Sequence, residues 1–172
     1  MKISGDPRPV ICFVCTGNAA RSVMARAMFA ERAPGYQAIG AGTLVLEGHP
    51  MSQRTRRALE RFEVSDPAHR SRRFGSEHAR ADLVVVMEPE HVHWVRRHHP
   101  EAAPRTGTLS RLVRDLSSEG TLDERVAALN LAQLATETWE EVVDPASGDQ
   151  AVFDSCAEIL DDLVGQLILR LP

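Results

Sequence analysis

The chain of 172 residues contains 43% hydrophobic and 26% charged residues, and its formal net charge at pH 7 is −4. This composition is typical of one soluble globular domain, which we expect to span residues 1–172, and no apolar run approaches the ~18 residues that cross a bilayer. We therefore expect neither a membrane protein nor a nucleic-acid binder, because the arginine-rich stretch 54–80 carries no recognised nucleic-acid-binding motif.

Strand-like and helix-like segments alternate along the chain. Unbroken apolar residues at 10–15, and from Leu83 onward within 82–87, predict buried strands, and weaker patterns predict strands at 37–41 and 104–108. Helices are predicted at 22–32, at 52–62 with Ser52 as the cap, and at 88–98, 122–139 and 149–169. Such alternation predicts an α/β fold with a parallel sheet and with ligands bound outside the carboxyl ends of the strands.

The last predicted helix has a clear amphipathic pattern. Its expected buried face consists of Val152, Cys156, Ile159, Leu160, Leu163, Leu167 and Ile168. Cys12, in the first strand, also falls on an apolar face. We therefore expect Cys12 and Cys156 to be core residues.

Charge is unevenly distributed along the sequence. Residues 54–80 include eight arginines, whereas 115–162 contain thirteen acidic residues and only one arginine, Arg125. A basic stretch can steer anionic substrates and an acidic one can accept a basic partner, but solvated helix faces are the plainer explanation of both.

Cysteine usage and the first residues bear on the cellular compartment. The three cysteines show no paired pattern, which fits a reducing environment in which a thiol stays reactive. Residues 1–7 contain no hydrophobic segment like that of a signal peptide. We therefore expect a cytoplasmic protein. For its oligomeric state, the sequence leaves a monomer or weak dimer open.

The most informative motif is Cys-Thr-Gly-Asn-Ala-Ala-Arg-Ser at 15–22, between the first strand and the first helix. Backbone N–H groups of such a loop converge on one point, and the helix N-terminus adds the positive end of its dipole. This nest suits a tetrahedral oxyanion and a thiolate. Gly17 and Asn18 tolerate the positive φ that a tight anion cradle needs. A thiolate and an oxyanion at one point imply phosphoryl transfer to sulfur.

Cys-x5-Arg-Ser after a strand resembles the loop of the low-molecular-weight protein tyrosine phosphatases, and four further segments match in the same order. They are Gly40-Ala41-Gly42-Thr43, His69-Arg70-Ser71-Arg72, Ala81 through Glu88, and Asp144-Pro145 before the last helix. The resemblance implies a three-layer, four-stranded parallel sheet of flavodoxin-like type, with helices on both faces.

The resemblance also implies a role for each residue of the motif. Cys15 would attack phosphorus as a thiolate, and Arg21 would hold the equatorial phosphoryl oxygens. Ser22 would donate to the Cys15 sulfur, while Asp144 would act first as the general acid and then as the base that activates water. Thr16, Gly17, Asn18, Ala19 and Ala20 would form the phosphate-binding loop, with His69 as its support. No metal or organic cofactor would be required.

Two of these features have plainer interpretations, and one further cluster invites a different function. Asp144-Pro145 alone is a common turn, and His69 is equally compatible with a surface loop. The histidines at 91, 93, 98 and 99 suggest a metal site, but their spacing gives no coherent ligand cage. We expect that cluster to be a solvated helix end.

The chain departs from the family's pattern at several points. Ala20 stands where the family commonly has a second cysteine, so we expect peroxide to inactivate Cys15 without a protective disulfide. Residues 44–47 and the pair after Asp144-Pro145 lack the aromatic residues that often form the family's pocket walls. The segment 110–143 is longer than usual, and we expect it to add a helix near the pocket rim.

The leading interpretation is a phosphatase that acts on phosphorylated protein, with phosphotyrosine as the substrate residue. A phosphoarginine phosphatase or a phosphatase of small phosphorylated molecules is an alternative on the same fold. An arsenate reductase is a further alternative, although it needs additional cysteines that shuttle a disulfide. An oxyanion-binding regulatory module without turnover is the alternative outside the enzymes.

Overall fold

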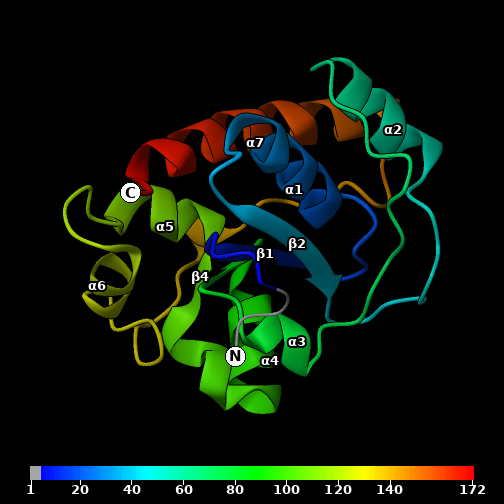
Figure 1. Ribbon diagram of the computed structural model, residues 1–172. Coiled ribbons are helices and arrows are strands. Elements are labelled where there is room, and N and C mark those ends of the chain that lie inside the picture. The colour runs from blue at the N-terminus through cyan, green and yellow to red at the C-terminus, as the bar shows by residue number, and fades with distance from the viewer. Residues whose placement is uncertain (1–4) are drawn as a thin grey trace.

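The computed structural model describes residues 5–172 (Figure 1). The expectation about a leader segment falls partly on residues 1–4, which lie outside the described residues. Four strands form one parallel sheet in the order β2-β1-β3-β4. They are β1 (Val10–Cys15), β2 (Gln37–Gly42), β3 (Leu83–Val86) and β4 (Thr106–Thr108). This confirms the predicted α/β fold with a four-stranded parallel sheet.

Helices cover both faces of the sheet. On one face, α1 (Arg21–Arg32) and α7 (Gln150–Arg170) pack together, with α2 (Gln53–Glu60) and α5 (Leu109–Asp115) against α7 (Figure 1). On the other face lie α3 (Ser76–Ala79) and α4 (Pro89–His98). The remaining elements are α6 (Leu122–Ala127) and two short 3-10 helices, Pro100–Arg105 and Thr138–Glu140.

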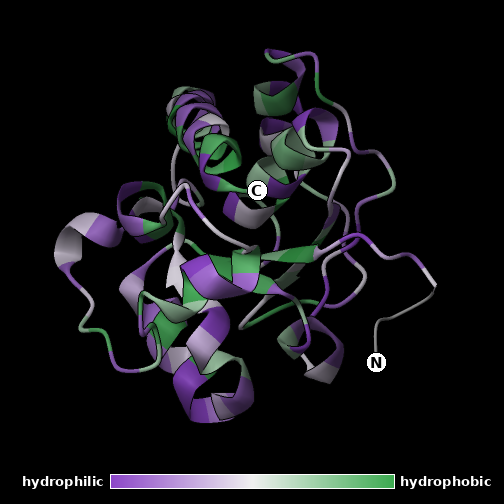
Figure 2. Ribbon diagram, turned by 60° about the vertical axis from the view of Figure 1, so that its left-hand side comes forward, coloured by the Kyte–Doolittle hydropathy of each residue, from purple (hydrophilic) through white to green (hydrophobic). Residues whose placement is uncertain are grey.

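Side-chain alternation along the strands divides the core in two. Ile11 and Phe13 of β1 belong to the cluster with α1 and α7, whereas Cys12 and Val14 belong to the cluster with α3 and α4. All four residues of β3 are buried, because helices cover that strand on both sides. Figure 2 shows the same layering, with largely hydrophobic strands between helices in which hydrophilic and hydrophobic residues alternate.

The buried face of α7 is shifted from the predicted one. Cys156, Leu160 and Leu167 are buried as expected, but Val152 and Ile159 are exposed, and Phe153, Ala157 and Val164 are buried. The shift follows from the partners, because α7 packs against α1, α2 and α5 at once rather than against a flat sheet. Among residues 5–172, neither α7 nor any other helix has both the length and the apolar composition that a membrane crossing requires.

The prediction of one helix over 122–139 is wrong. The helix α6 ends at Ala127, Asn130 has a φ of +51°, and the chain then runs through turns to the 3-10 helix at Thr138–Glu140. Arginine side chains of other helices donate hydrogen bonds to carbonyls that would accept backbone N–H groups if the helix continued. Arg96 donates to the carbonyls of Leu131 and Leu134, both at 2.6 Å. These tertiary hydrogen bonds override the local helical pattern.

Three further details of the same region differ from the predictions. The fourth strand begins at Thr106 rather than at 104, because 100–105 form a 3-10 helix. Helices α3 and α5 were not predicted; α5 begins where the hydroxyl of Thr108 accepts the N–H of Arg111. The added helix α6 does not lie at the pocket rim, since Arg125 donates to the carbonyl of Arg170 at the far end of α7.

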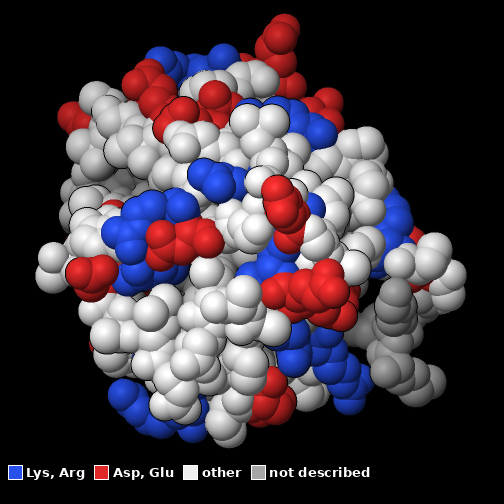
Figure 3. Space-filling view, turned by 90° about the vertical axis from the view of Figure 1, so that its left-hand side faces the viewer, with Lys and Arg blue, Asp and Glu red and all other residues white. Residues whose placement is uncertain are grey.

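The surface around α5 and α6 shows no separate acidic region. In the view onto that side of the molecule, basic and acidic side chains lie next to one another over the visible face (Figure 3). Arg114 and Asp115, for example, form an ion pair at 2.7 Å. On this face, the acidic residues of the last third of the chain are therefore interspersed with arginines.

Candidate active site

The loop between β1 and α1 lies at the carboxyl edge of the sheet, near its centre. Cys15 is the last residue of β1, Arg21 is the first residue of α1, and residues 16–20 connect them. Strand β1 has a neighbour on each side, so the loop sits between the ends of β2 and β3. This is the position at which open α/β sheets bind ligands, with the N-terminus of a helix facing the site.

A chain of hydrogen bonds ends at the Cys15 sulfur. The side-chain amide of Asn18 donates to the Ser22 hydroxyl at 2.9 Å, and the Ser22 oxygen lies 3.0 Å from the Cys15 sulfur. Ser22 is fully buried. Because its oxygen already accepts from Asn18, its single proton is available for the sulfur. The Ser22 hydroxyl is therefore placed to donate a hydrogen bond to the Cys15 sulfur.

Asn18 fixes the shape of the loop from within. Its φ is +50°, and it is the residue of the loop that adopts the positive φ; Gly17 does not. Its carbonyl accepts from the Ser71 hydroxyl at 2.8 Å and lies 2.9 Å from Nε2 of His69, while its side-chain oxygen accepts the N–H of Arg72 at 2.9 Å. The segment 69–72 is thus placed against the loop, which is where the sequence analysis expected His69.

His69 is nearly buried rather than a free surface residue. Burial lowers the pKa of His69 below its ordinary value. A neutral imidazole has one N–H, and the carbonyl of Asn18 at 2.9 Å is an acceptor for it.

Neighbouring elements hold the loop from outside. The N–H groups of Thr43 and Leu44, which follow β2, donate to the carbonyls of Cys15 and Thr16 at 3.0 and 2.9 Å. The Thr55 hydroxyl of α2 donates to the carbonyl of Ala19 at 2.9 Å. These bonds use loop carbonyls, so they leave the loop N–H groups free to face an anion.

Arg21 is almost fully buried and is surrounded by acceptors from distant parts of the chain. Its Nη1 forms an ion pair with Glu88 and donates to the carbonyl of Val142 at 2.8 Å. Its Nη2 lies 3.4 Å from a carboxylate oxygen of Asp144, whose side chain is 46% exposed. Asp144 is therefore brought to the loop although it lies more than a hundred residues from Cys15, and its carboxylate is open to solvent and to a substrate.

Glu88 was not among the predicted site residues, and the prediction for His91 is wrong. Glu88 lies two residues after the end of β3, and β3 pairs with β1, so an acid at that point lies beside the start of α1. The sequence contains a signal for this role, because Glu88 is an acidic residue near the carboxyl end of a predicted buried strand, and a buried arginine there needs a counter-charge.

His91 is buried, not part of a solvated helix end. Its Nδ1 accepts the N–H of Met87 at 3.4 Å, and its Nε2 lies 2.9 Å from the Thr16 hydroxyl. Burial lowers the pKa of His91 to about 4, so the ring is neutral at pH 7. With Nδ1 as the acceptor, the proton is on Nε2 and is donated to Thr16, and the hydroxyl proton of Thr16 is left for another acceptor.

The other two cysteines are buried, as expected of core residues. Burial raises the pKa of Cys156 to about 11 and raises that of Cys12 further. Cys12 lies in the core cluster on the opposite face of the sheet from Cys15. Within residues 5–172, no group of three or more His, Cys, Asp or Glu side chains is arranged to hold a metal ion.

The rim of the site is aliphatic. Leu44 follows the β2 strand next to the loop and is 73% exposed, and Val143, which precedes Asp144, is 69% exposed. The sequence predicts a pocket without the usual aromatic walls. The described residues at these two points agree with it.

The sequence is similar to those of known phosphatases. The sequence profile described as "Low molecular weight phosphotyrosine protein phosphatase" matches residues 10–121. A low molecular weight protein-tyrosine-phosphatase from Streptomyces coelicolor is 32% identical, over 88% of this chain and 86% of its own. A protein-arginine-phosphatase from Geobacillus stearothermophilus is 28% identical, over 94% of this chain and 95% of its own.

The fold is also similar to solved structures of phosphatases. The YwlE arginine phosphatase from Geobacillus stearothermophilus superposes with a TM-score of 0.74 at 27% identity, covering 92% of this chain and 90% of its own. A low molecular weight protein tyrosine phosphatase from T. tengcongensis superposes with a TM-score of 0.76, also at 27% identity, covering 95% and 99%.

Proposed function

Because the chain belongs to the low molecular weight phosphotyrosine protein phosphatase family of hydrolases, we propose that it removes phosphoryl groups through a covalent phosphocysteine at Cys15. The observation that carries this proposal is the hydrogen-bond chain from Asn18 through Ser22 to the Cys15 sulfur, in a loop that ends at the N-terminus of α1. A hydroxyl that donates to the sulfur is what a thiolate nucleophile at the centre of an oxyanion site would require, and this supports the proposal.

In the first step, the Cys15 thiolate attacks phosphorus in line with the leaving oxygen. A sulfur–phosphorus bond forms, the phosphorus–oxygen bond to the leaving group breaks, and Asp144 gives its proton to that oxygen. In the second step, Asp144 takes a proton from water, and the water oxygen attacks phosphorus. The sulfur leaves as a thiolate, and the hydrogen bond from Ser22 stabilises it as it departs.

Arg21 is the residue proposed to stabilise the charge on the phosphoryl group. Glu88 and the carbonyl of Val142 hold its Nη1, so the edge formed by Nε and Nη2 is the one proposed to meet two phosphoryl oxygens. The loop N–H groups surround the same oxygens. The Thr16 hydroxyl, whose oxygen accepts from His91, is one further donor for them.

We propose protein phosphotyrosine as the substrate, in keeping with the relatives named as tyrosine phosphatases. A second candidate, protein phosphoarginine, is favoured by the aliphatic rim at Leu44 and Val143, which offers no aromatic face for a phenyl ring. The relative that matches over 94% of this chain is named a protein-arginine-phosphatase. Arsenate reduction is not proposed, because Cys12 lies on the far side of the sheet and Cys156 is a buried thiol.

The test uses two peptides of one sequence, one with phosphotyrosine and one with phosphoarginine at the same position. Release of phosphate by the wild type and by Cys15→Ser is compared at pH 6 and pH 7. We expect hydrolysis of the phosphotyrosine peptide that disappears in the variant. A kcat/KM that is higher for the phosphoarginine peptide would favour the second candidate, and no turnover of either peptide or of p-nitrophenyl phosphate would contradict the proposal.

A further inference from the structure

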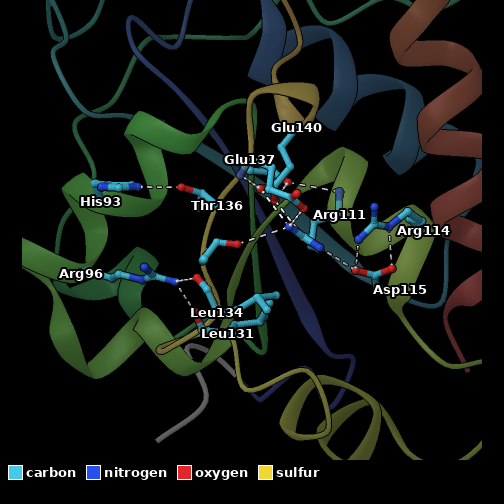
Figure 4. A network of polar contacts seen from close by, with 12 residues as sticks. His93, Arg96, Arg111, Arg114, Asp115, Leu131, Leu134, Thr136, Glu137 and Glu140 are labelled. Carbon is cyan, nitrogen blue, oxygen red and sulfur yellow. Dashed lines mark hydrogen bonds and ion pairs between the residues drawn. The ribbon is translucent and has the colours of Figure 1, made fainter.

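A buried ion pair lies in the segment that precedes Asp144 (Figure 4). Arg111 of α5 donates hydrogen bonds to both carboxylate oxygens of Glu140, from Nε to Oε1 at 3.0 Å and from Nη2 to Oε2 at 3.2 Å. The Arg111 and Glu140 side chains are only 6% and 2% exposed. Two parallel charge-assisted hydrogen bonds in a buried site fix both distance and orientation.

The remaining polar atoms of this pair are also satisfied. Glu140 accepts from the Thr108 hydroxyl at 2.9 Å and from the N–H of Glu137 at 2.5 Å. Arg111 also pairs with the carboxylates of Asp115 and Glu137, both at 3.0 Å. The hydrogen bonds that Arg111 donates to Glu140 raise the pKa of Arg111 above its ordinary value, so the guanidinium stays charged. Such complete satisfaction makes a buried network rigid.

Other side chains extend this attachment along the segment 131–140. Two guanidinium groups lie over the Trp139 ring, with the central carbon of Arg111 4.7 Å and that of Arg114 4.0 Å from the ring centroid. Arg96 of α4 donates to two carbonyls of the segment, and His93 lies 2.9 Å from the Thr136 hydroxyl (Figure 4). Helices α4 and α5 therefore hold from two sides a stretch that has little regular structure of its own.

The chain passes from this network directly into the candidate active site. Val142 lies two residues after Glu140. Its N–H donates to the carbonyl of Met87 at 2.7 Å, and the carbonyl of Val142 accepts from Arg21. Two residues further lies Asp144, half exposed and outside any helix or strand. Its carboxylate also accepts the N–H of Ala146 at 3.0 Å. Residues 141–144 thus run between the Glu140 anchor and the start of α7.

We propose that Arg111 and Glu140 are positioning residues that place the carboxylate of Asp144 over the phosphate-binding loop. The inference rests on the proposed function, in which Asp144 protonates the leaving oxygen. Proton transfer requires hydrogen-bond distance, and an error of about 1 Å in the position of a reacting group lowers rates by as much as ~10²-fold. The 131–136 stretch of the segment before Asp144 lies in turns and coil, so regular structure does not fix the position of Glu140 and the ion pair with Arg111 does.

The test compares leaving groups. Phenyl phosphate releases a phenol of ordinary pKa, about 10, and it needs a general acid, whereas p-nitrophenyl phosphate releases a far more acidic phenol and needs one much less. The parameter is kcat/KM, because it covers the steps up to departure of the leaving group and does not depend on hydrolysis of the phosphocysteine. The variants are Glu140→Gln and Arg111→Lys, with Asp144→Asn as the reference.

We expect Glu140→Gln and Arg111→Lys to lower kcat/KM for phenyl phosphate by ~10-fold or more, and for p-nitrophenyl phosphate by roughly twofold. A general loss of folded protein would lower both values equally. Arg32→Met is the control, since it removes an ion pair between α1 and Asp161 of α7, at the end of α1 remote from the loop. Where Asp144→Asn shows the leaving-group dependence and the variants are as fully folded as the wild type by circular dichroism, equal losses for both substrates, or no loss, would overturn the proposal.

A second measurement covers the case in which the single variants unfold and separates this inference from the proposed function. The double variant Arg111→Met with Glu140→Met leaves no unpaired buried charge, and its amide hydrogen exchange is compared with that of the wild type. Faster exchange at 141–146 with unchanged exchange in β1 supports the anchor; unchanged exchange at 141–146 overturns it. If Asp144→Asn shows no leaving-group dependence, the acid role of Asp144 fails, while hydrogen exchange still decides whether the anchor holds the segment.

Discussion

Asn18→Ala tests whether the side chain of Asn18 holds the phosphate-binding loop together. The substitution leaves the N–H of Arg72 without its acceptor and removes the donor to Ser22. An unpaired, partly buried N–H costs about 1–3 kcal/mol, and alanine at a φ of +50° costs about 1–2 kcal/mol. We therefore expect the free energy of unfolding to fall by about 3 kcal/mol.

Thermal unfolding followed by circular dichroism measures this loss, which corresponds to a decrease of ~6–12 °C in Tm for a chain of this size. Asn130→Ala is the matched control, since Asn130 also has a positive φ, +51°, but is exposed. Asn130→Ala should lower the free energy of unfolding by only about 1 kcal/mol. In addition, only Asn18→Ala should lower kcat for p-nitrophenyl phosphate, by about tenfold, because the Ser22 hydroxyl is no longer oriented. Equal effects of the two substitutions on both Tm and kcat would refute the reasoning.

Three further predictions concern pH, packing and oxidation. Burial lowers the pKa of His91 from 6.5 to about 4, so the unfolded chain binds more protons than the folded chain between these pH values. The contribution of His91 to the free energy of unfolding is therefore fully present above pH 6.5, and it falls by about 3 kcal/mol as the pH decreases to 4. His91→Gln should flatten this part of the stability–pH curve measured by urea denaturation, and an unaltered curve would contradict the assignment. A Cβ at Gly42 would lie 2.5 Å from the Thr16 carbonyl oxygen, so Gly42→Ala should displace the loop and lower kcat/KM by about 10²-fold, while Gly35→Ala, with open space around it, should not. Because Ala20 supplies no second thiol and Cys156 is a buried thiol with a pKa of about 11, peroxide should convert Cys15 to sulfinic and sulfonic acids that dithiothreitol does not reverse; a Cys15–Cys156 disulfide in the peptide map would show the opposite.

The parts of the structure that could be predicted are those set by local sequence. Residues 10–15 and the start of α1 follow from an apolar run and a loop whose residue types suit one backbone shape. The end of α7 nearest the site follows from Asp149, whose carboxylate accepts the N–H of Val152 at 3.2 Å.

The parts that escaped prediction depend on contacts between distant segments. The end of α6 is decided by Arg96, which binds carbonyls more than thirty residues away. The burial of His91 depends on β3 lying next to β1, because that pairing brings the first turn of α4 beside Thr16. For the same reason, the partnership of Glu88 with Arg21 is visible only in the folded chain.

The central claim is that Cys15 carries the phosphoryl group during turnover. The most direct measurement is rapid acid quenching of the enzyme during hydrolysis of p-nitrophenyl phosphate, followed by mass spectrometry of the peptide that contains residues 10–21. We expect one added phosphoryl group on Cys15 in the wild type and neither this adduct nor turnover in Cys15→Ser. Steady hydrolysis by Cys15→Ser, or a phosphoryl group on another residue, would contradict the claim.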